Sequence, residues 1–370
     1  MMNYYKSLLR SICFVLFFIL LAVGVNFYVD HYAVRQTLFS GGKPLYPASY
    51  PDGINQHIFN VELILRNPEK FDSFLFGSSR VNVIDVGKIP SGRFYNMSYI
   101  QGLPTQHLAV VKAFLKEGIQ IKSVVVGLDG FCFNMKASDY QYHLTRVMHP
   151  KSGGPGLLKT FGLYFFRKPD MEEIKRFRDR KKNIHPERRY MISDNGRMLT
   201  WQYLEKVIAN IGKPLFSYEV TAYEPLRFES DATEESFTAI EELLALSRQN
   251  NFTVVFFISP FYHQLYLNKA EALFKIKKRL ATVADYYDFS GFNSITTNPT
   301  NYYEESHYRY HIGDMILRRI YDENATGVPD DFGILVTKQN IDEHVHRQKL
   351  ELKAYLHRHN MTSSTSSLKD

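Results

Sequence analysis

The chain contains little cysteine: only Cys13 and Cys132 occur among its 370 residues. Cys13 lies in an N-terminal apolar run and Cys132 follows an apolar segment, so their different environments do not predict a disulfide. Such a low cysteine count suits a reducing cytosol and a bacterial periplasm equally well. The count therefore does not decide the compartment.

The chain also lacks internal repeats and any recognised nucleic-acid-binding motif, so its formal net charge of +7 does not predict nucleic-acid binding. The modest positive excess favours anionic lipid headgroups, anionic glycans or no particular partner. The His344/His346 and His357/His359 pairs are each spaced by two residues. In a helix this spacing points the two imidazole rings apart, so a solvated helix is favoured over a metal site. No metal and no cofactor are predicted.

Charge is absent from one long N-terminal run, Ser11 to Val29, whose 19 residues approach the roughly 20 that a membrane-spanning helix needs. Lys6 and Arg10 before it and Asp30 after it predict a cytoplasmic N-terminus, with the rest outside the cytoplasmic membrane. A cleaved signal peptide, cut after residues 22–24, is the rival interpretation. Because the apolar run continues past that position, we favour a retained single-pass anchor in the inner membrane with a periplasmic main domain.

Apolar strands alternate with helical patterns along the rest of the chain. Continuous apolar strands such as Ser123–Leu128 are typical of a buried parallel sheet, and the alternation predicts an α/β fold with helices on both faces. The other predicted strands are Ser73–Phe76, Phe94–Ser98, Thr253–Ile258 and, as the last strand, Tyr287–Phe289. The predicted helices run from Asn60 to about Asn67, Gln106 to Lys116, Glu234 to Gln249, about Asn268 to Val283, and His307 to Tyr321.

These patterns divide the chain into five parts. An anchor (1–30) and an irregular connection (31–59) precede an α/β domain built from 60–135 and 236–325. Residues 136–235 form an insertion in that domain, resembling a cap, and 326–370 form a C-terminal extension with an exposed helix over 341–359 and a disordered Ser/Thr tail.

Two short motifs about 230 residues apart carry the chemistry. Gly77-Ser78-Ser79-Arg80 follows a predicted strand, and Glu304-Glu305-Ser306-His307 places an acid three residues before a histidine. A serine at a strand-to-turn junction, a histidine base and an acid that orients it can together supply an activated nucleophile. The alternatives are ordinary caps: a serine that caps a turn, and a surface histidine at a helix start, where His311 is a weaker candidate base.

An early serine and a late acid-x-x-His resemble the SGNH (GDSL-type) hydrolases. Ser78 stands at the Asp position of their Gly-Asp-Ser block, and Glu304 stands at the Asp position of their Asp-x-x-His block. The branch that it resembles includes the D-alanyl transfer protein of teichoic acid modification and alginate O-acetylation proteins. The resemblance covers residues 60–135 and 236–325 and implies a flavodoxin-like three-layer fold. It also implies Ser79 as nucleophile, His307 as base and Glu304 as its orienter.

The same resemblance implies an oxyanion site made by the serine N–H, a glycine and an asparagine. Asn96 and Gly102 suit its second block, and Ser78 and Arg80 flank the nucleophile. The third block should read Gly-x-Asn but reads Gly127-Leu128-Asp129, and an ionised carboxylate would repel a developing oxyanion. Three interpretations of Asp129 stay open: a protonated acid, a group that serves the acceptor, or a turn cap.

A basic block, Arg167 to Arg189, has ten Lys/Arg against five Asp/Glu. It is interpreted either as a solvated face or as a contact with anionic headgroups or glycans. We expect a membrane-anchored extracytoplasmic serine esterase or O-acyltransferase that modifies a bacterial envelope polysaccharide or polymer. A membrane-bound O-acyltransferase is the partner that the resemblance implies. The alternative is a catalytically degenerate SGNH scaffold that docks to such an enzyme or to a polymer exporter.

Overall fold

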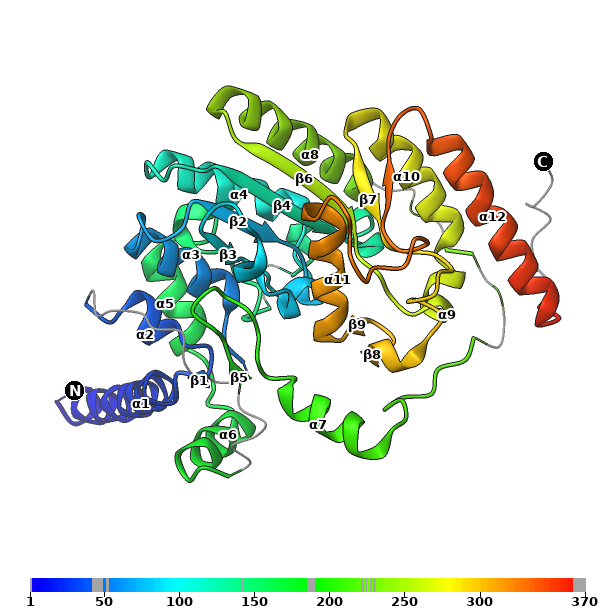
Figure 1. Cartoon of the computed structure of the whole chain (residues 1–370). Coiled ribbons are helices and arrows are strands. Elements are labelled where there is room, and N and C mark those ends of the chain that lie inside the picture. Colours follow the sequence, from blue (N-terminus) through cyan, green and yellow to red (C-terminus); the bar gives the residue numbers. More distant parts are fainter. Residues whose placement is uncertain are drawn as a thin grey trace.

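The computed structural model describes residues 2–41, 49–50, 53–140, 143–184, 190–220, 223, 225–226, 228 and 231–361. It is an α/β structure with a six-stranded, mostly parallel sheet (Figure 1). The helices are α1 Met2–Val29, α2 Val34–Leu38, α3 Gln56–Arg66, α4 Pro104–Lys116, α5 Leu157–Phe165, α6 Met171–Lys181, α7 Gln202–Ile211, α8 Asp231–Asn250, α9 His263–Leu267, α10 Ala270–Val283, α11 Tyr310–Tyr321 and α12 Ile341–Arg358. The strands are β1 Ser49–Tyr50, β2 Ser73–Phe76, β3 Phe94–Asn96, β4 Ser123–Leu128, β5 Tyr190–Met191, β6 Thr253–Ile258, β7 Tyr286–Asp288, β8 Tyr302–Glu304, β9 His307–Tyr308 and β10 Ile334–Val336.

The main sheet has the order β10-β7-β6-β4-β2-β3. Strands β2, β3, β4, β6 and β7 are parallel, and numbered in chain order they lie 2-1-3-4-5 across the sheet. The predicted limits of β2, β4 and β6 are confirmed. The prediction that β7 is the last strand is wrong, because β10 adds an antiparallel edge strand beside it.

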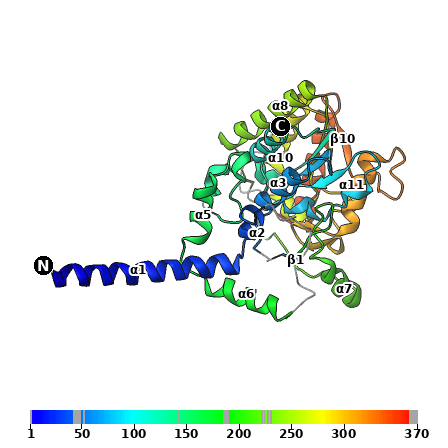
Figure 2. The ribbon, with the colours of Figure 1, turned by 90° about the vertical axis from the view of Figure 1, so that its left-hand side faces the viewer.

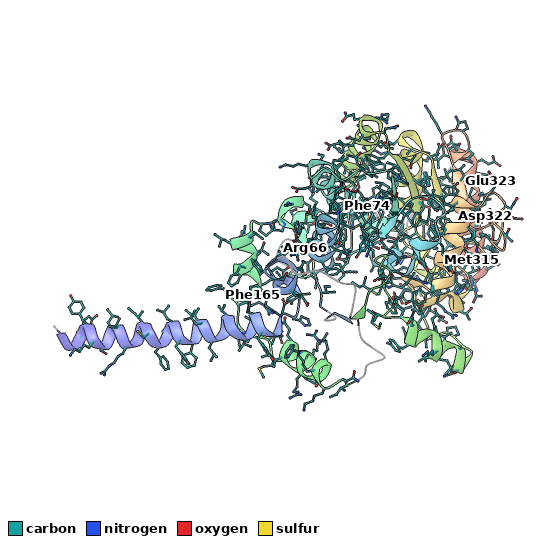
Figure 3. The ribbon with its side chains drawn as sticks, turned by 60° about the vertical axis from the view of Figure 1, so that its left-hand side comes forward. Arg66, Phe74, Phe165, Met315, Asp322 and Glu323 are labelled. Atoms are coloured by element: carbon teal, nitrogen blue, oxygen red, sulfur yellow. The ribbon has the colours of Figure 1, made fainter. Side chains whose placement is uncertain are left out.

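Both faces of the sheet are covered. Alternate residues of one strand point to opposite faces, so Phe74 of β2 joins a core with helices α3, α4, α8, α10 and α12, whereas its neighbour Leu75 joins a second core with α11. Figure 3 places Phe74 inside the body of the molecule. The two cores hold the carboxyl ends of the parallel strands in fixed positions, and the loops after these ends carry the two chemical motifs.

Helix α1 projects from this body (Figure 2) and is the one helix of the described residues that is long and apolar enough to cross a membrane. Its last turns pack on α5: the buried Asn26 side chain donates to the carbonyls of Phe165, at 3.1 Å, and Arg167, at 2.7 Å. These carbonyls lie at the end of α5, where a helix leaves its last carbonyl groups unpaired. Figure 3 shows Phe165 where α1 meets the body.

The predicted insertion, residues 136–235, separates into two parts. Helices α5 and α6 lie beside the end of α1, whereas α7 lies farther along the lower edge of the body, beside the β8–β9 ribbon (Figure 1). The connection over 31–59 is more regular than predicted, since it contains α2 and the start of α3. The end of α1 packs on α2, α3 and α5, a surface that local sequence patterns do not reveal. Helix α7 instead bonds through Glu205 to Tyr303 and Arg309.

Helix α12 was predicted to be exposed, and this is wrong for one of its faces. His344 is buried and bonds through Nε2 to Asp288 Oδ2 at 2.7 Å, and the fully buried Lys277 ammonium lies 2.8 Å from the same carboxylate. Burial opposes ionisation of Asp288, but the charge of Lys277 and the His344 bond outweigh it and lower the pKa of this carboxyl. Because a buried carboxylate needs such partners, α12 is held against β7. The predicted Ser/Thr tail lies outside the described residues.

Candidate active site

Ser79 lies directly after β2, as the first residue of the short 3₁₀ helix η1, Ser79–Val83. The Ser78 hydroxyl accepts from the Arg80 N–H at 3.2 Å and so caps this helix. The capping interpretation therefore applies to Ser78 and leaves the Ser79 hydroxyl free for another role. Ser79 is only partly buried, so a ligand can approach its side chain.

Glu304 and His307 face each other across a two-stranded antiparallel ribbon, β8–β9, in which they form a register pair. The prediction that this motif opens a helix is wrong, since α11 begins only at Tyr310. Glu305 and Ser306 connect the two strands, which brings the acid and the imidazole together. The spacing of three residues thus brings Glu304 to His307 through a turn between two strands, and not through a helix.

The two distant motifs meet at the carboxyl edge of the sheet. Ser79 Oγ lies 2.8 Å from His307 Nε2, within the expected 2.6–3.2 Å, and the His307 Nδ1–H donates to Glu304 Oε1. Burial disfavours the Glu304 carboxylate, but its bonds to His307 and to the Ser306 N–H, with the charge of Arg80, outweigh this and lower its pKa. The arrangement has the hydrogen-bond order of a serine, a base and an orienting acid.

Asp129 lies at the end of β4 but does not face an open site. Arg80 Nη1 donates to its Oδ1 at 2.6 Å, and the Ser78 hydroxyl donates to its Oδ2. Both charged side chains are buried, with 7% of Arg80 and 0% of Asp129 exposed. The turn-cap interpretation of Asp129 is wrong, because its side chain makes no capping bond to the following 3₁₀ helix.

Arg80 connects three segments of the site. Besides Asp129, its guanidinium donates to the Ser306 carbonyl through Nε at 3.0 Å and to the Ser306 hydroxyl through Nη2 at 3.0 Å. Ser306 is adjacent to His307, so Arg80 fixes the imidazole loop to the serine loop. All of these bonds are made by the Arg80 guanidinium inside the protein. Arg80 is therefore placed to position His307.

The two second-block candidates are also committed to internal bonds. The Asn96 amide donates to the Val81 and Ile84 carbonyls at 2.8 and 3.2 Å, and its oxygen accepts from the Ser98 N–H. A Cβ at Gly102 would lie 2.6 Å from the Gly77 carbonyl oxygen, so this position requires glycine. However, the Gly102 N–H donates to the Tyr99 carbonyl at 3.3 Å.

The remaining oxyanion candidate is the backbone of the nucleophile itself. Among the hydrogen bonds of the described residues, none uses the Ser79 N–H. A backbone donor at the nucleophile is one standard component of an oxyanion site.

Sequence reasoning did not identify Trp201, which lies just before α7. Its ring stacks on the His307 ring with centroids 5.5 Å apart, and on the Tyr303 ring with centroids 4.9 Å apart. Glu205 of α7 accepts bonds from Tyr303 and Arg309, which flank the motif. Arg309 and Tyr303 lower the pKa of Glu205 despite its partial burial. The signal for this contact was the single tryptophan of the chain.

Lys269 was also missed. Its ammonium lies 5.9 Å from the Phe261 ring centroid, and the Arg80 guanidinium lies 5.0 Å from the same ring. Burial, with the nearby Arg80 charge, lowers the pKa of Lys269 to about 8. His311, the weaker candidate base, bonds to Asn301 at 3.1 Å. No cluster of metal-binding side chains occurs in the described part of the chain.

No family model, curated protein or solved structure matches this chain.

Proposed function

We propose that the protein is a membrane-anchored serine esterase or O-acyltransferase that acts on a bacterial envelope polysaccharide or polymer. The observation that carries the proposal is the 2.8 Å contact between Ser79 Oγ and His307 Nε2, with Glu304 on the other imidazole nitrogen. An unassisted serine hydroxyl is a weak nucleophile, and this arrangement provides the base that it needs.

In the proposed reaction, Ser79 Oγ attacks the carbonyl carbon of an acyl ester while His307 Nε2 takes the hydroxyl proton. The oxyanion that forms accepts a hydrogen bond from the Ser79 N–H. When the intermediate collapses, the ester C–O bond breaks and His307 returns the proton to the leaving alcohol. A sugar hydroxyl or water then attacks the acyl-enzyme by the same steps, with His307 again as base.

The position of the site in the sheet supports this proposal. The strand order 2-1-3-4-5 is the flavodoxin-like order, and it reverses between β2 and β4. Ligands of open α/β sheets bind beyond the carboxyl ends of the strands at such a reversal. Ser79 follows β2 and Asp129 follows β4, so the proposed nucleophile occupies this position. The SGNH-type three-layer fold is part of the proposal.

A non-catalytic scaffold, docked to a membrane-bound O-acyltransferase or a polymer exporter, is the second candidate. One observation favours it: Asp129 stands where the resemblance implies a donor, and the side chain of Asn96 and the N–H of Gly102 are committed elsewhere. The Ser79 N–H would then be the main oxyanion donor, and removal of one such donor costs about 10²–10³ in rate.

A fluorophosphonate probe distinguishes these candidates. An activated serine displaces fluoride from the phosphorus, so the intact mass should rise by the mass of one probe less hydrogen fluoride. We expect one adduct per chain, located by peptide mapping at Ser79. An absence of labelling, under conditions that fully label a known serine esterase, would leave the scaffold as the better candidate.

The anchor gives a separate prediction. Because α1 is one continuous helix through residues 22–24 and its Asn26 is bonded to α5, we expect it to be retained. The full-length protein should stay in the membrane fraction after a carbonate wash, and a periplasmic reporter fused to its C-terminus should be active. Release of the protein into the soluble periplasmic fraction would contradict retention.

Trp201 should tune the rate without supplying chemistry. Trp201→Ala removes the ring stacked on His307, and an aromatic contact contributes about 1 kcal/mol beyond its buried area, so the labelling rate should fall roughly 5- to 10-fold. Trp201→Phe keeps a ring in place and should recover most of the rate. Equal rates for the wild type and the alanine variant would show that the stack does not position His307.

A further inference from the structure

A bilayer around α1 would extend past its fully exposed residues, 4–21, and reach the turns that pack on the body. Residues 4–21 are exposed on all sides, and packing on the body begins after them. A span of about 20 residues that starts anywhere from Lys6 to Ser11 ends between Val25 and Asp30. The turns of α1 that pack on α5 and α6 therefore fall at the boundary between hydrocarbon and headgroups.

Helix α6 packs beside the end of α1. The Glu173 carboxylate accepts from the Tyr32 hydroxyl at 3.0 Å, just beyond the end of α1, and one turn later Phe177 packs on Tyr28 with ring centroids 5.2 Å apart. These contacts hold α6 against the last turns of α1. Residues of both helices, from Leu20 to Val29 and from Ile174 to Lys182, line one groove.

An apolar groove of about 630 Å³ separates the two helices. Its walls are Leu20, Leu21, Gly24 and Val25 on one side and Ile174 and Phe177 on the other. Its volume is within the roughly 300–1,000 Å³ of ordinary ligand pockets. Apolar walls at this depth favour a hydrocarbon chain over water.

Three cations, Arg178, Lys181 and Lys182, also line the groove. Arg178 Nε lies 3.6 Å from Asp179, whereas neither lysine has a carboxylate partner within the described part of the chain. The Lys181 ammonium lies 5.6 Å from the Phe177 ring centroid. Ammonium groups without a carboxylate partner attract a phosphate, and each contributes about 1 kcal/mol near an anionic membrane surface. Phe166, just after α5, and Met171, the first residue of α6, are also exposed, with 60% and 75% of their surfaces accessible.

We propose that the groove between α1 and α6 binds one anionic phospholipid, with an acyl chain between the helices and its phosphate at Lys181, Lys182 and Arg178. The occupant follows from charge complementarity and from continuity of the groove with the bilayer around α1. This lipid holds the body at a fixed orientation on the membrane. The proposal depends on α1 lying in a bilayer and does not depend on acyl transfer.

The test uses full-length protein in detergent micelles, titrated with dioleoyl-phosphatidylglycerol or dioleoyl-phosphatidylcholine and observed by native mass spectrometry. These lipids share acyl chains and differ in headgroup charge. We expect one phosphatidylglycerol to bind at least about tenfold more tightly than phosphatidylcholine, as two or more phosphate contacts imply. Equal retention of the two lipids would overturn the proposal and leave the groove to an apolar partner helix.

Two variants separate the headgroup from the chain. Arg178→Gln/Lys181→Gln/Lys182→Gln should remove the preference, whereas the control Lys168→Gln/Lys175→Gln/Arg176→Gln, with the same charge change outside the groove, should keep it. Gly24→Leu should fill the groove and weaken phosphatidylglycerol binding without a clash, because its Cβ meets nothing within 4 Å. Binding that survives the first variant, is lost equally in the control, or ignores Gly24→Leu would each contradict the assigned site.

Discussion

Ser79→Ala is expected to abolish fluorophosphonate labelling and to reduce acyl transfer at least ~10⁴-fold, because it removes the only atom that forms the acyl bond. His307→Ala should have a comparable effect, since the hydroxyl then has no base. Both side chains are partly exposed. Ser79→Ala removes one hydrogen bond, so the free energy of unfolding of this variant should fall by only about 1 kcal/mol. The measurements are single-turnover acyl transfer and urea unfolding.

Two further variants should lose less activity than Ser79→Ala and His307→Ala. Glu304→Gln should cost less than either change, of order 10³-fold, because it leaves the base present but no longer favours the useful imidazole tautomer. Ser78→Ala is the matched control, since it removes the neighbouring hydroxyl and should retain labelling. It should lose about 1–3 kcal/mol of stability, because the cap and the bond to the buried Asp129 carboxylate are both removed. If Ser78→Ala loses the label and Ser79→Ala keeps it, the nucleophile is misassigned.

The sheet could be predicted well from the sequence, because buried parallel strands are continuous apolar runs. The limits of β2, β4 and β6 follow from runs such as Ser123–Leu128. Ser79 was predicted to follow such a strand, and it lies after β2. His307 was predicted at a helix start but lies in β9. Edge strand β10 was missed, since it is only three residues long and its pairing with β7 is set by the docking of α12.

The surroundings of the site could not be predicted, since they depend on contacts between distant segments. The motif around His307 has the acids and spacing of a helix start, yet Glu205, about 100 residues earlier, bonds to both Tyr303 and Arg309 and stabilises a ribbon instead. Asp129 likewise shows no local sign of its partner. That partner, Arg80, is 49 residues away in the sequence and lies 2.6 Å from the carboxylate in the fold.

Arg80→Met should destabilise the protein by about 3–5 kcal/mol, because it leaves the Asp129 carboxylate buried without its countercharge. Urea unfolding measures this loss. The variant should also label slowly, since Ser306 loses the three guanidinium bonds that fix the His307 loop to the serine loop. A displacement of about 1 Å at a catalytic group can cost roughly 10²-fold in rate.

The double variant Arg80→Met/Asp129→Leu separates these two effects. Replacing both members of a buried ion pair by apolar residues is often neutral for stability, so most of the lost unfolding free energy should return. The labelling rate should stay low, because neither new side chain can bond to Ser306. If instead the double variant regains both stability and rate, Arg80 serves only to neutralise Asp129, and the His307 loop is positioned by Trp201 and Glu205 alone.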